Sequence, residues 1–382
     1  MKQDDSVRWR NLVAAFSAIV VFGFTFGMTF PLLSLLLEDR GVGPDMIGIN
    51  SAMMPIGILL FSSIIPVASK RFGTRNLALV AAFVTAVLVI CFKVFDNLAA
   101  WFLIRLVTGM SISTLFVLSE AWIVRFAGDE HRGKIVALYA SVLSISFGTG
   151  PAIISWIGIH GWTPFVLGAV ILLIGMIPLT MIRDNEAGPP EETETSGIFS
   201  FAGKAPMLLM AVAVFAIFDS ATLSLFPVYG LRSGMDVSMA SLALTALIFG
   251  NVVLQFPIGW LADRFSKRLV IGGCAFTAAL LAALLPFVMG SPVMWPIIVL
   301  MGAAGYGVYT VSLASLGDRF QGPELVTGSA AFAVMWGVGA LVGGISGGWA
   351  MAFSHHGLMV LLAAVYLLLM VGMVLRSRQA AR

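Results

Sequence analysis

Charged residues and cysteines are scarce in this chain. Only 11% of its 382 residues are Asp, Glu, Lys or Arg, against roughly 25% in ordinary soluble domains, whereas 59% are hydrophobic. No soluble core hides so many apolar stretches of about 20 residues. The two cysteines, Cys91 and Cys274, fall inside such stretches. They therefore fit small packing residues, and a disulfide framework is excluded.

Motifs of catalysis and nucleotide binding are also missing. The sequence has no P-loop, no metal-ligand cluster and no nucleophile motif, so ATP-driven pumping and enzymatic chemistry lack support, and no cofactor or metal is expected. A lipid-modifying membrane enzyme would need clustered His, Asp or Cys residues at one interface. The four histidines, His131, His160, His355 and His356, do not form such a set on one side. We expect no enzymatic activity.

The chain is rich instead in long apolar runs. Its mean hydropathy is +1.00, and twelve runs are long enough to cross a bilayer as helices. They lie at residues 11–37, 45–68, 75–95, 98–124, 133–158, 162–182, 206–230, 237–261, 269–289, 293–316, 325–353 and 356–375. The first run is too long for a signal-peptide core, so we expect a retained span. The sequence predicts an all-α integral membrane protein with twelve transmembrane helices.

Lys and Arg set the predicted orientation. Eighteen of the 22 fall on one side of the predicted spans, and only Arg40, Lys93 and Arg232 fall on the other. Because cytoplasmic loops carry the excess of basic residues, both termini are predicted to be cytoplasmic. The pI near 9.0 reflects charge spread over these short loops and not a basic face. No nucleic-acid partner is therefore expected.

Asp219 is the one acid in the middle of a predicted span, within MLLMAVAVFAIFDSATLSLFPVY. A carboxylate there costs on the order of 2–3 kcal/mol on insertion scales, unless it takes up a proton or faces a polar cavity. Its predicted depth is close to the midplane, where transporters commonly bind substrates and coupling ions. A group that is neutral in one state and charged in another is a candidate proton switch. The alternative is a satisfied carboxylate at a helix contact.

The polar segment 184–204 interrupts the apolar pattern. It separates six predicted spans in residues 1–183 from six in residues 205–382, and it is predicted to be a mobile cytoplasmic linker. The two halves share loop sequences: PVASKRFGTRN at 66–76 aligns with GWLADRFSKRL at 259–269, and GDEHRG at 128–133 aligns with GDRFQG at 317–322. These offsets, 193 residues (66 to 259) and 189 residues (128 to 317), predict a duplicated six-helix unit.

The loops also resemble the hallmark of the major facilitator superfamily, a Gly-x-x-x-Asp-Arg-x-Gly-Arg-Arg-like sequence between the second and third helices. The matching residues of the second half are Gly259, Asp263, Arg264, Lys267 and Arg268, with Ser266 in place of a glycine. Those of the first half are Arg71, Gly73 and Arg75, with Pro66 and Lys70 in place of glycine and aspartate. The chain is similar to this family over essentially its whole length, which implies two six-helix pseudo-repeats. The resemblance further implies a cytoplasmic gate at these loops, and plain membrane topology is the alternative.

The predicted helix 98–124 resembles the family's fourth-helix motif through Arg105 and Gly109 in LIRLVTG. This implies a role for Arg105 in proton movement or substrate contact, with snorkelling to the outer surface as the alternative. Glu120 lies about 22 Å further along, so the two cannot bond directly. We expect Glu120 to pair with basic residues of the gate or to join a proton path. The Glu-Ala-Trp run that begins at Glu120 resembles the YcaD-like bacterial branch of the superfamily.

Polar and aromatic residues within the spans are expected to line the substrate cavity. These are Phe26, Thr29, Asn50, Tyr139, Asn251, Gln255, Tyr306, Tyr309 and Trp336. Asn251 and Gln255, four apart on one helix face, are the strongest candidates. Gly150 and Pro151 resemble the family's fifth-helix antiporter motif, which favours export. A closely packed helix bend is the alternative interpretation.

Together these patterns predict a secondary active transporter that moves a small organic solute across a bacterial inner membrane by alternating access. Protons are favoured over sodium because Asp219 is one isolated carboxylate and not an oxygen-rich cage. Arg105 and Glu120 are the next candidates for coupling. The expected partners are the solute, protons and the lipid bilayer, and the chain is expected to function as a monomer. The alternative is a non-transporting membrane sensor or scaffold with the same fold.

Overall fold

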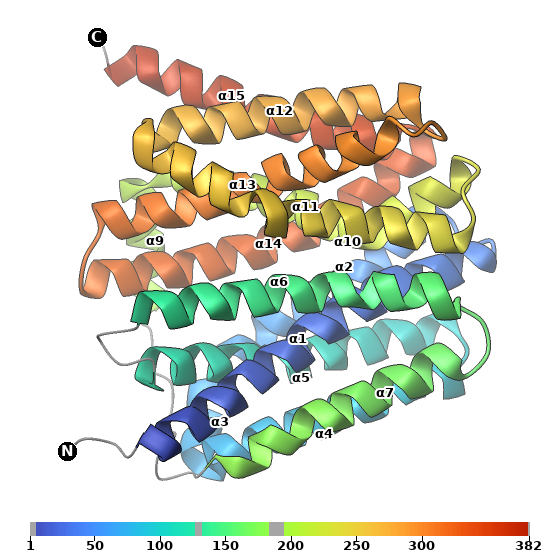
Figure 1. Cartoon of the computed structure of the whole chain (residues 1–382), viewed down its shortest axis with the longest axis vertical. Coiled ribbons are helices and arrows are strands. Elements are labelled where there is room, and N and C mark those ends of the chain that lie inside the picture. Colours follow the sequence, from blue (N-terminus) through green and yellow to red (C-terminus); the bar gives the residue numbers. More distant parts are fainter. Residues whose placement is uncertain (1–4, 127–131, 183–194, 381–382) are drawn as a thin grey trace. The chain divides into compact units, whose positions relative to one another are not determined.

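Figure 1 shows the computed structural model, in which long helices make up the chain. The structure describes residues 5–126, 132–182 and 195–380, and no strand occurs among them. The elements are α1 (Asp5–Asp39), α2 (Pro44–Ser62), α3 (Ile65–Phe72), α4 (Thr74–Val94), α5 (Leu98–Phe126), α6 (Arg132–Ile157), α7 (Thr163–Met176), η1 (Ile177–Met181), α9 (Thr195–Lys204), α10 (Pro206–Arg232), α11 (Val237–Arg264), α12 (Lys267–Val288), α13 (Met294–Arg319), α14 (Pro323–Phe353) and α15 (Gly357–Ala380).

Twelve of the described segments are long and apolar enough to cross a membrane, which confirms the predicted number of spans. The short helices α3 and α9 are not among them, and α7 continues into η1 as one span, Thr163–Met181. The predicted run 45–68 is in fact two elements, because α2 ends at Ser62 and α3 begins at Ile65. Pro66 stands at the start of α3, where its missing N–H costs no helical hydrogen bond.

The chain divides into two compact units. The first comprises Met1–Leu32 and Met53–Glu192, and the second comprises Leu33–Ala52 and Thr193–Arg382. This division differs from the one expected at the linker alone, because the end of α1 and the beginning of α2 pack with the second unit. Both helices therefore continue from one unit into the other.

The segment expected to be a mobile linker ends in a helix, which the sequence reasoning missed. Helix α9 occupies Thr195–Lys204, and Phe201 on it is 2% exposed. The Phe201 ring lies 4.8 Å from the ring of Phe320, and Lys204 forms an ion pair with Glu324. One buried aromatic residue and one ion pair therefore hold α9 within the second unit. Residues 183–194 of the expected linker lie outside the described residues.

Glycines bring two helices of the first unit into backbone contact. A Cβ atom at Gly109 of α5 would lie 2.9 Å from the carbonyl carbon of Met54 on α2 and closer still to its oxygen. Conversely, a Cβ at Gly57 of α2 would lie 2.9 Å from the amide nitrogen of Met110 and collide with the carbonyl oxygen of Leu106, both on α5. Only glycine fits at these two positions, so α2 and α5 cross at the closest distance that their backbones allow.

The second unit repeats this arrangement between α11 and α13. A Cβ at Gly250 would collide with the carbonyl of Val299, and one at Gly302 would collide with the carbonyl of Leu247. These four residues each lie 193 positions after Gly57, Leu106, Gly109 and Met54 (57 to 250, 106 to 299, 109 to 302 and 54 to 247). The offset of 193 residues found in the loop sequences is therefore also an offset between equivalent helix contacts. Each unit contains the same reciprocal glycine contact.

Helices α1 and α10 are the most enclosed of the spans. Within their most apolar windows, 94% of the α1 residues and 83% of the α10 residues are buried, against 33–56% for the other ten spans. Polar groups on these two helices consequently face protein, where a hydrogen-bonding partner is needed. Asp219 lies on α10.

Candidate functional site

Asp219 lies in the middle of α10 and is 5% exposed. Two side chains from other helices donate hydrogen bonds to its carboxylate. The Tyr306 hydroxyl on α13 donates to Oδ1 at 2.8 Å, and the Trp336 indole N–H on α14 donates to Oδ2 at 3.3 Å. Both oxygens of Asp219 are thus engaged, and one carboxyl connects three helices.

Aromatic rings enclose this carboxyl. Phe215, one helical turn before Asp219, stacks on Tyr309 with ring centroids 4.7 Å apart and meets Tyr306 edge-on at 5.5 Å. Phe218 meets Tyr306 at 5.8 Å. The expected cavity residues Tyr306, Tyr309 and Trp336 therefore gather around the expected coupling residue, and each of the three is only half-buried. The apolar rings lower the local dielectric and strengthen the polar contacts among them.

The sequence of α13 explains how these groups come so close. Gly305 precedes Tyr306, and a Cβ atom there would lie 2.6 Å from Cε1 of Phe218. The glycine therefore lets α13 approach α10 closely enough for the Tyr306 hydroxyl to reach Asp219. The Tyr366 hydroxyl of α15 donates to the Gly305 carbonyl at 3.0 Å and fixes the other side of α13.

Arg105 is a buried cation in the first unit. Its exposure is 0%, and its guanidinium lies over the Phe30 ring, 5.4 Å from the centroid. Nη2 reaches the Thr29 carbonyl at 3.5 Å, whereas Nε and Nη1 have no hydrogen-bond partner among the described residues. A guanidinium cannot lose its charge at ordinary pH. The first unit therefore holds a desolvated positive charge that its described side chains leave largely unsatisfied.

Glu120 does not share the surroundings of Arg105. It lies near the end of α5 and is exposed. The neighbouring Ser119 is buried, and its hydroxyl is 2.8 Å from that of Tyr139 on α6. Tyr139, an expected cavity residue, thus joins α5 to α6 at this level of the helix.

The remaining expected cavity residues fall into two groups. Phe26 and Thr29 are buried on α1, where Phe26 stacks on Phe30 at 4.8 Å and the Thr29 hydroxyl donates to the Thr25 carbonyl at 2.6 Å. The amide residues belong to the second unit: Asn50 is fully buried, Asn251 is 8% exposed and Gln255 is half-buried. Both polar atoms of the Asn50 side chain and Oδ1 of Asn251 have no hydrogen-bond partner among the described residues.

Gly150 and Pro151 lie within α6, which continues through the proline. A Cβ atom at Gly150 would collide with the backbone of Gly27 and Met28 on α1. Gly150 therefore permits close packing of α6 on α1 inside the first unit.

Three of the expected gate residues of the second half, Asp263, Lys267 and Arg268, line an open cavity of about 550 Å³. Lys267 forms an ion pair with Asp318 of α13, and Arg268 donates to the Met373 carbonyl of α15. Arg264 lies over the Trp260 ring, 4.1 Å from the centroid. A Cβ atom added at Gly259 would have no other atom within 4 Å. The expected Asp-Arg motif is thus connected to α13 and α15 by its two later basic residues.

The first-half loop differs. Gly73, between α3 and α4, has a φ of +80°, a conformation that favours glycine. Arg71 is exposed, with its guanidinium 5.5 Å from the Phe72 ring centroid, and Arg75 is half-buried with a partner. Among the described residues no cluster of three or more His, Cys, Asp or Glu side chains could hold a metal ion.

The sequence matches the model of one protein family over most of its length. The family model described as Major Facilitator Superfamily matches residues 15–248 and 233–382. The chain belongs to the major facilitator superfamily. It is therefore a multi-pass membrane protein of a transporter family and not an enzyme.

Relatives within the superfamily are similar over nearly their whole length. The chain is 24% identical to the uncharacterized MFS-type transporter YfkF of Bacillus subtilis (strain 168), over 93% of each chain. It is 22% identical to the uncharacterized MFS-type transporter YcaD of Escherichia coli O139:H28, over 94% of this chain and 95% of that one. The resemblance to the YcaD-like branch is thereby confirmed. The solved structure of the nucleoside transporter NupG has a TM-score of 0.77 at 12% identity, covering 96% of this chain and 98% of that chain, and this likeness concerns the fold.

Sequence reasoning missed two polar connections of this superfamily member. The ion pair between Lys267 and Asp318 was not expected, although both residues stand in quoted loop motifs. An ion pair between Glu38 and Arg232 was missed as well, because each is an unremarkable charge at a helix end.

Proposed function

We propose that this protein is a proton-coupled secondary transporter that exports a small organic solute by alternating access, with Asp219 as its coupling residue. The observation that carries the proposal is the connection of one buried carboxyl to both α13 and α14. Membership of a transporter superfamily supports transport as such. Export is favoured by Gly150 and Pro151, which resemble the antiporter motif of the family.

The chemistry of Asp219 explains how a proton would change the protein. A carboxylate accepts both the Tyr306 and Trp336 hydrogen bonds, whereas a protonated carboxyl becomes a donor at one oxygen. One of the two bonds must then weaken or reorganise. Protonation therefore changes the contact of α10 with α13 or α14, and a conformational equilibrium that involves these helices shifts with it.

The buried guanidinium of Arg105 supports a solute that carries an anionic group. Its Nε and Nη1 lack acceptors among the described residues, and a carboxylate or phosphate would supply two in the fork geometry that Arg prefers.

Transport by the purified protein in proteoliposomes tests the proposal. Anionic, neutral and cationic solutes are screened with and without a pH gradient. For a solute that is moved, Asp219→Asn should abolish proton-driven accumulation and preserve exchange of solute for solute, because Asn keeps the volume but cannot exchange a proton. Glu324→Gln, which removes an exposed carboxylate of α14, serves as the matched control and should behave as the wild type.

Two further variants probe the hydrogen bonds and the solute class. Tyr306→Phe removes the donor to Asp219 and should alter the pH dependence of accumulation, whereas Tyr366→Phe removes a hydroxyl from the same aromatic group that bonds only Gly305 and should not. Arg105→Gln should weaken transport of an anionic solute. Accumulation by Asp219→Asn at the wild-type pH dependence would place coupling elsewhere. No flux of any solute would favour the sensor or scaffold alternative.

A further inference from the structure

The open cavity of about 550 Å³ in the second unit lies where α11 ends, α12 begins and α13 ends. Three basic and two acidic side chains from these elements line it. Lys267 is paired with Asp318, so two basic residues and one acid, Asp263, are left to face the cavity. The charge that remains is positive, which favours an anionic occupant.

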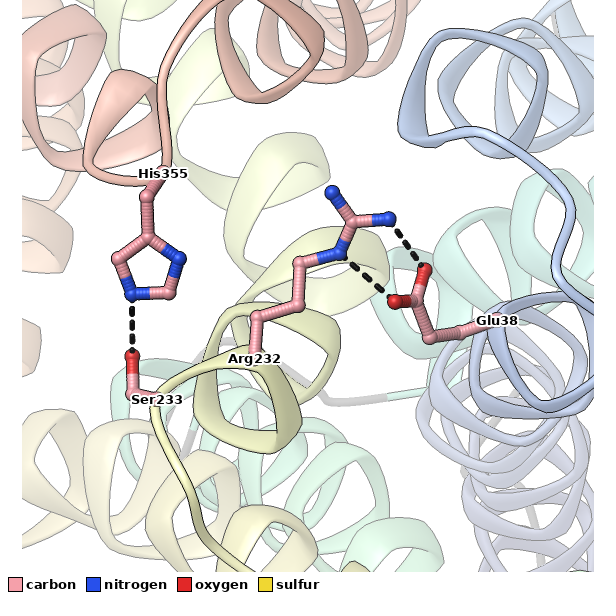
Figure 2. Close-up of polar contacts among 4 residues, drawn as sticks. All are labelled: Glu38, Arg232, Ser233 and His355. Carbon is pink, nitrogen blue, oxygen red and sulfur yellow. Dashed lines mark hydrogen bonds and ion pairs between the residues drawn. The ribbon is translucent and has the colours of Figure 1, made fainter.

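Arg319 is the basic residue of this cavity whose charge has no partner. Elsewhere in the second unit Arg232 donates twice to Glu38, at 2.7 and 3.0 Å, as Figure 2 shows. Arg268, within the cavity, donates to the Met373 carbonyl. Arg319 stands at the end of α13, is exposed, and has no ion pair or hydrogen bond among the described residues. Its guanidinium is therefore available to an anion that enters the cavity.

Two further kinds of hydrogen-bond donor line the same cavity. Ser315 of α13 is 3% exposed, and its hydroxyl has no hydrogen bond to a described residue. A buried hydroxyl without a partner costs free energy that an oxygen atom of a ligand would recover. At the start of α12 the Ser266 side chain accepts from the Leu269 N–H at 3.4 Å, which leaves the N–H groups of Lys267 and Arg268 without a partner inside the helix. Such N–H groups favour a phosphate.

The cavity lies at the boundary between the membrane and water. It is formed by the ends of α11, α12 and α13, each of which is long and apolar enough to span the membrane. That side of the protein is predicted to be cytoplasmic. Phe265 in the cavity wall is 53% exposed, and Leu269, Phe276 and Leu280 are exposed on one face of α12. An exposed apolar face on a membrane-spanning helix borders lipid, so an anion in this cavity stands at the depth of lipid headgroups.

We propose that this cavity binds the phosphate group of an anionic phospholipid from the cytoplasmic leaflet. A phosphodiester is negatively charged and keeps a pair of free oxygens, which would accept from the Arg319 guanidinium and the Ser315 hydroxyl. Basic pockets between membrane-spanning helices on the cytoplasmic side bind such headgroups in other membrane proteins. The bound lipid connects the start of α12 to the end of α13 and therefore stabilises the second unit.

Lipid binding is measured on the purified full-length protein in detergent. Dioctanoyl phosphatidylglycerol is titrated in, the lipid adduct is followed by native mass spectrometry, and the unfolding temperature is recorded in parallel. Dioctanoylglycerol, which has the same chains and no phosphate, and inorganic phosphate at equal ionic strength are the comparison ligands. We expect a saturable phosphatidylglycerol adduct that raises the unfolding temperature, no such effect of dioctanoylglycerol, and only weak competition by inorganic phosphate.

Three variants of the cavity should change the affinity for phosphatidylglycerol. Arg319→Gln should weaken binding about five- to tenfold, because a charge-assisted hydrogen bond is lost. Ser315→Ala removes a neutral donor and should weaken binding about two- to threefold. Asp263→Asn removes the acid that still faces the cavity, so it should tighten binding about two- to threefold.

Two matched controls lie close by. Arg264→Gln removes the neighbouring basic residue at the end of α11, which stacks on Trp260 and is not among the residues that line the cavity. Ser312→Ala removes a buried hydroxyl one turn before Ser315, which donates to the Val308 carbonyl. Neither control should change lipid affinity.

Equal losses of affinity in Arg319→Gln and Arg264→Gln would reveal unspecific attraction to basic charge and overturn the site. So would binding of dioctanoylglycerol as tight as that of phosphatidylglycerol, or displacement of the lipid by inorganic phosphate at equal concentration, which would indicate a soluble anion. Asp263→Asn guards against misfolding, because an unfolded variant does not bind more tightly; weaker binding by this variant would contradict the charge argument. No measurement requires transport, so failure of the lipid site leaves the proposed function untouched.

Discussion

Gly109→Ala and Gly273→Ala should change stability in opposite directions, although they are the same chemical substitution within helices. Gly109 lies where α5 crosses α2, and an added Cβ would stand 2.9 Å from the carbonyl carbon of Met54 and 3.0 Å from its Cα. Gly273 lies inside α12, and an added Cβ would meet nothing within 4 Å. The pair thus separates the effect of helix propensity from that of packing.

The magnitudes follow from these distances. Carbon atoms pack favourably at about 3.5–4.0 Å, so α2 and α5 would have to separate by roughly 0.5 Å or more at Gly109. Overpacking of this kind costs about 1–3 kcal/mol, whereas Gly→Ala in a helix without a clash gains roughly 0.5–1 kcal/mol. Gly109→Ala should therefore lower the unfolding temperature and Gly273→Ala should raise it, with about 1.5–4 kcal/mol between the two variants.

Thermal unfolding of the purified protein in one detergent, followed by the fluorescence of a thiol dye or by loss of the monodisperse peak, measures both variants side by side. Gly302→Ala, the equivalent substitution 193 residues later in the second unit (109 to 302), should be as destabilising as Gly109→Ala. Equal unfolding temperatures for Gly109→Ala and Gly273→Ala would refute the backbone contact. A loss at Gly109 without one at Gly302 would refute the equivalence of the two crossings.

Three other outcomes are expected. Asp263→Asn, in the loop whose later basic residues contact α13 and α15, should slow transport with solute affinity kept within a few-fold; wild-type turnover would leave the motif a topological signal. The pKa of His355 is lowered by desolvation and by the nearby His356 and Arg232, so the folded protein resists protonation of this side chain. Stability is therefore lost as the pH falls below the ordinary pKa of about 6.5. Arg232→Gln should raise the pKa of His355 in an NMR titration, and an unchanged pKa would contradict the contribution of Arg232. In a background without Cys91 and Cys274, external thiol reagents should modify a cysteine at position 160 or 290 and spare position 195; labelling at 195 in intact cells would overturn the predicted topology.

The number and place of the spans could be predicted because twelve apolar runs carry that information locally. The end of α2 at Ser62 could not be predicted, because the break between α2 and α3 lies inside one continuous apolar run. Helix α9 could not be predicted for the opposite reason, because its segment has no continuous apolar run. Its anchor is one buried aromatic residue, Phe201, within a stretch whose composition is polar, and its stability comes from contacts with residues far along the chain.

The candidate site shows the same limit. Asp219 could be found from sequence because a single carboxylate in an apolar run stands out by its cost. Its donors Tyr306 and Trp336 lie 87 and 117 positions away, and the sequence indicated only that both were polar aromatics within spans. Their convergence depends on Gly305 and on how α13 packs against α10, which no local pattern encodes.

The internal repeat offers a stronger form of sequence evidence than either single residue. The offset of 193 residues between the loops at 66–76 and 259–269 predicts that helices at the same offset make equivalent contacts, and the four backbone contacts of the two glycine crossings meet that prediction. The two buried charged residues do not follow the repeat: position 298, equivalent to Arg105, is Ile, and position 26, equivalent to Asp219, is Phe (105 to 298 and 26 to 219). Duplication therefore accounts for the scaffold shared by the two units. The buried cation of one unit and the buried acid of the other arose outside that symmetry, which is what residues retained for a function, and not for packing, would show.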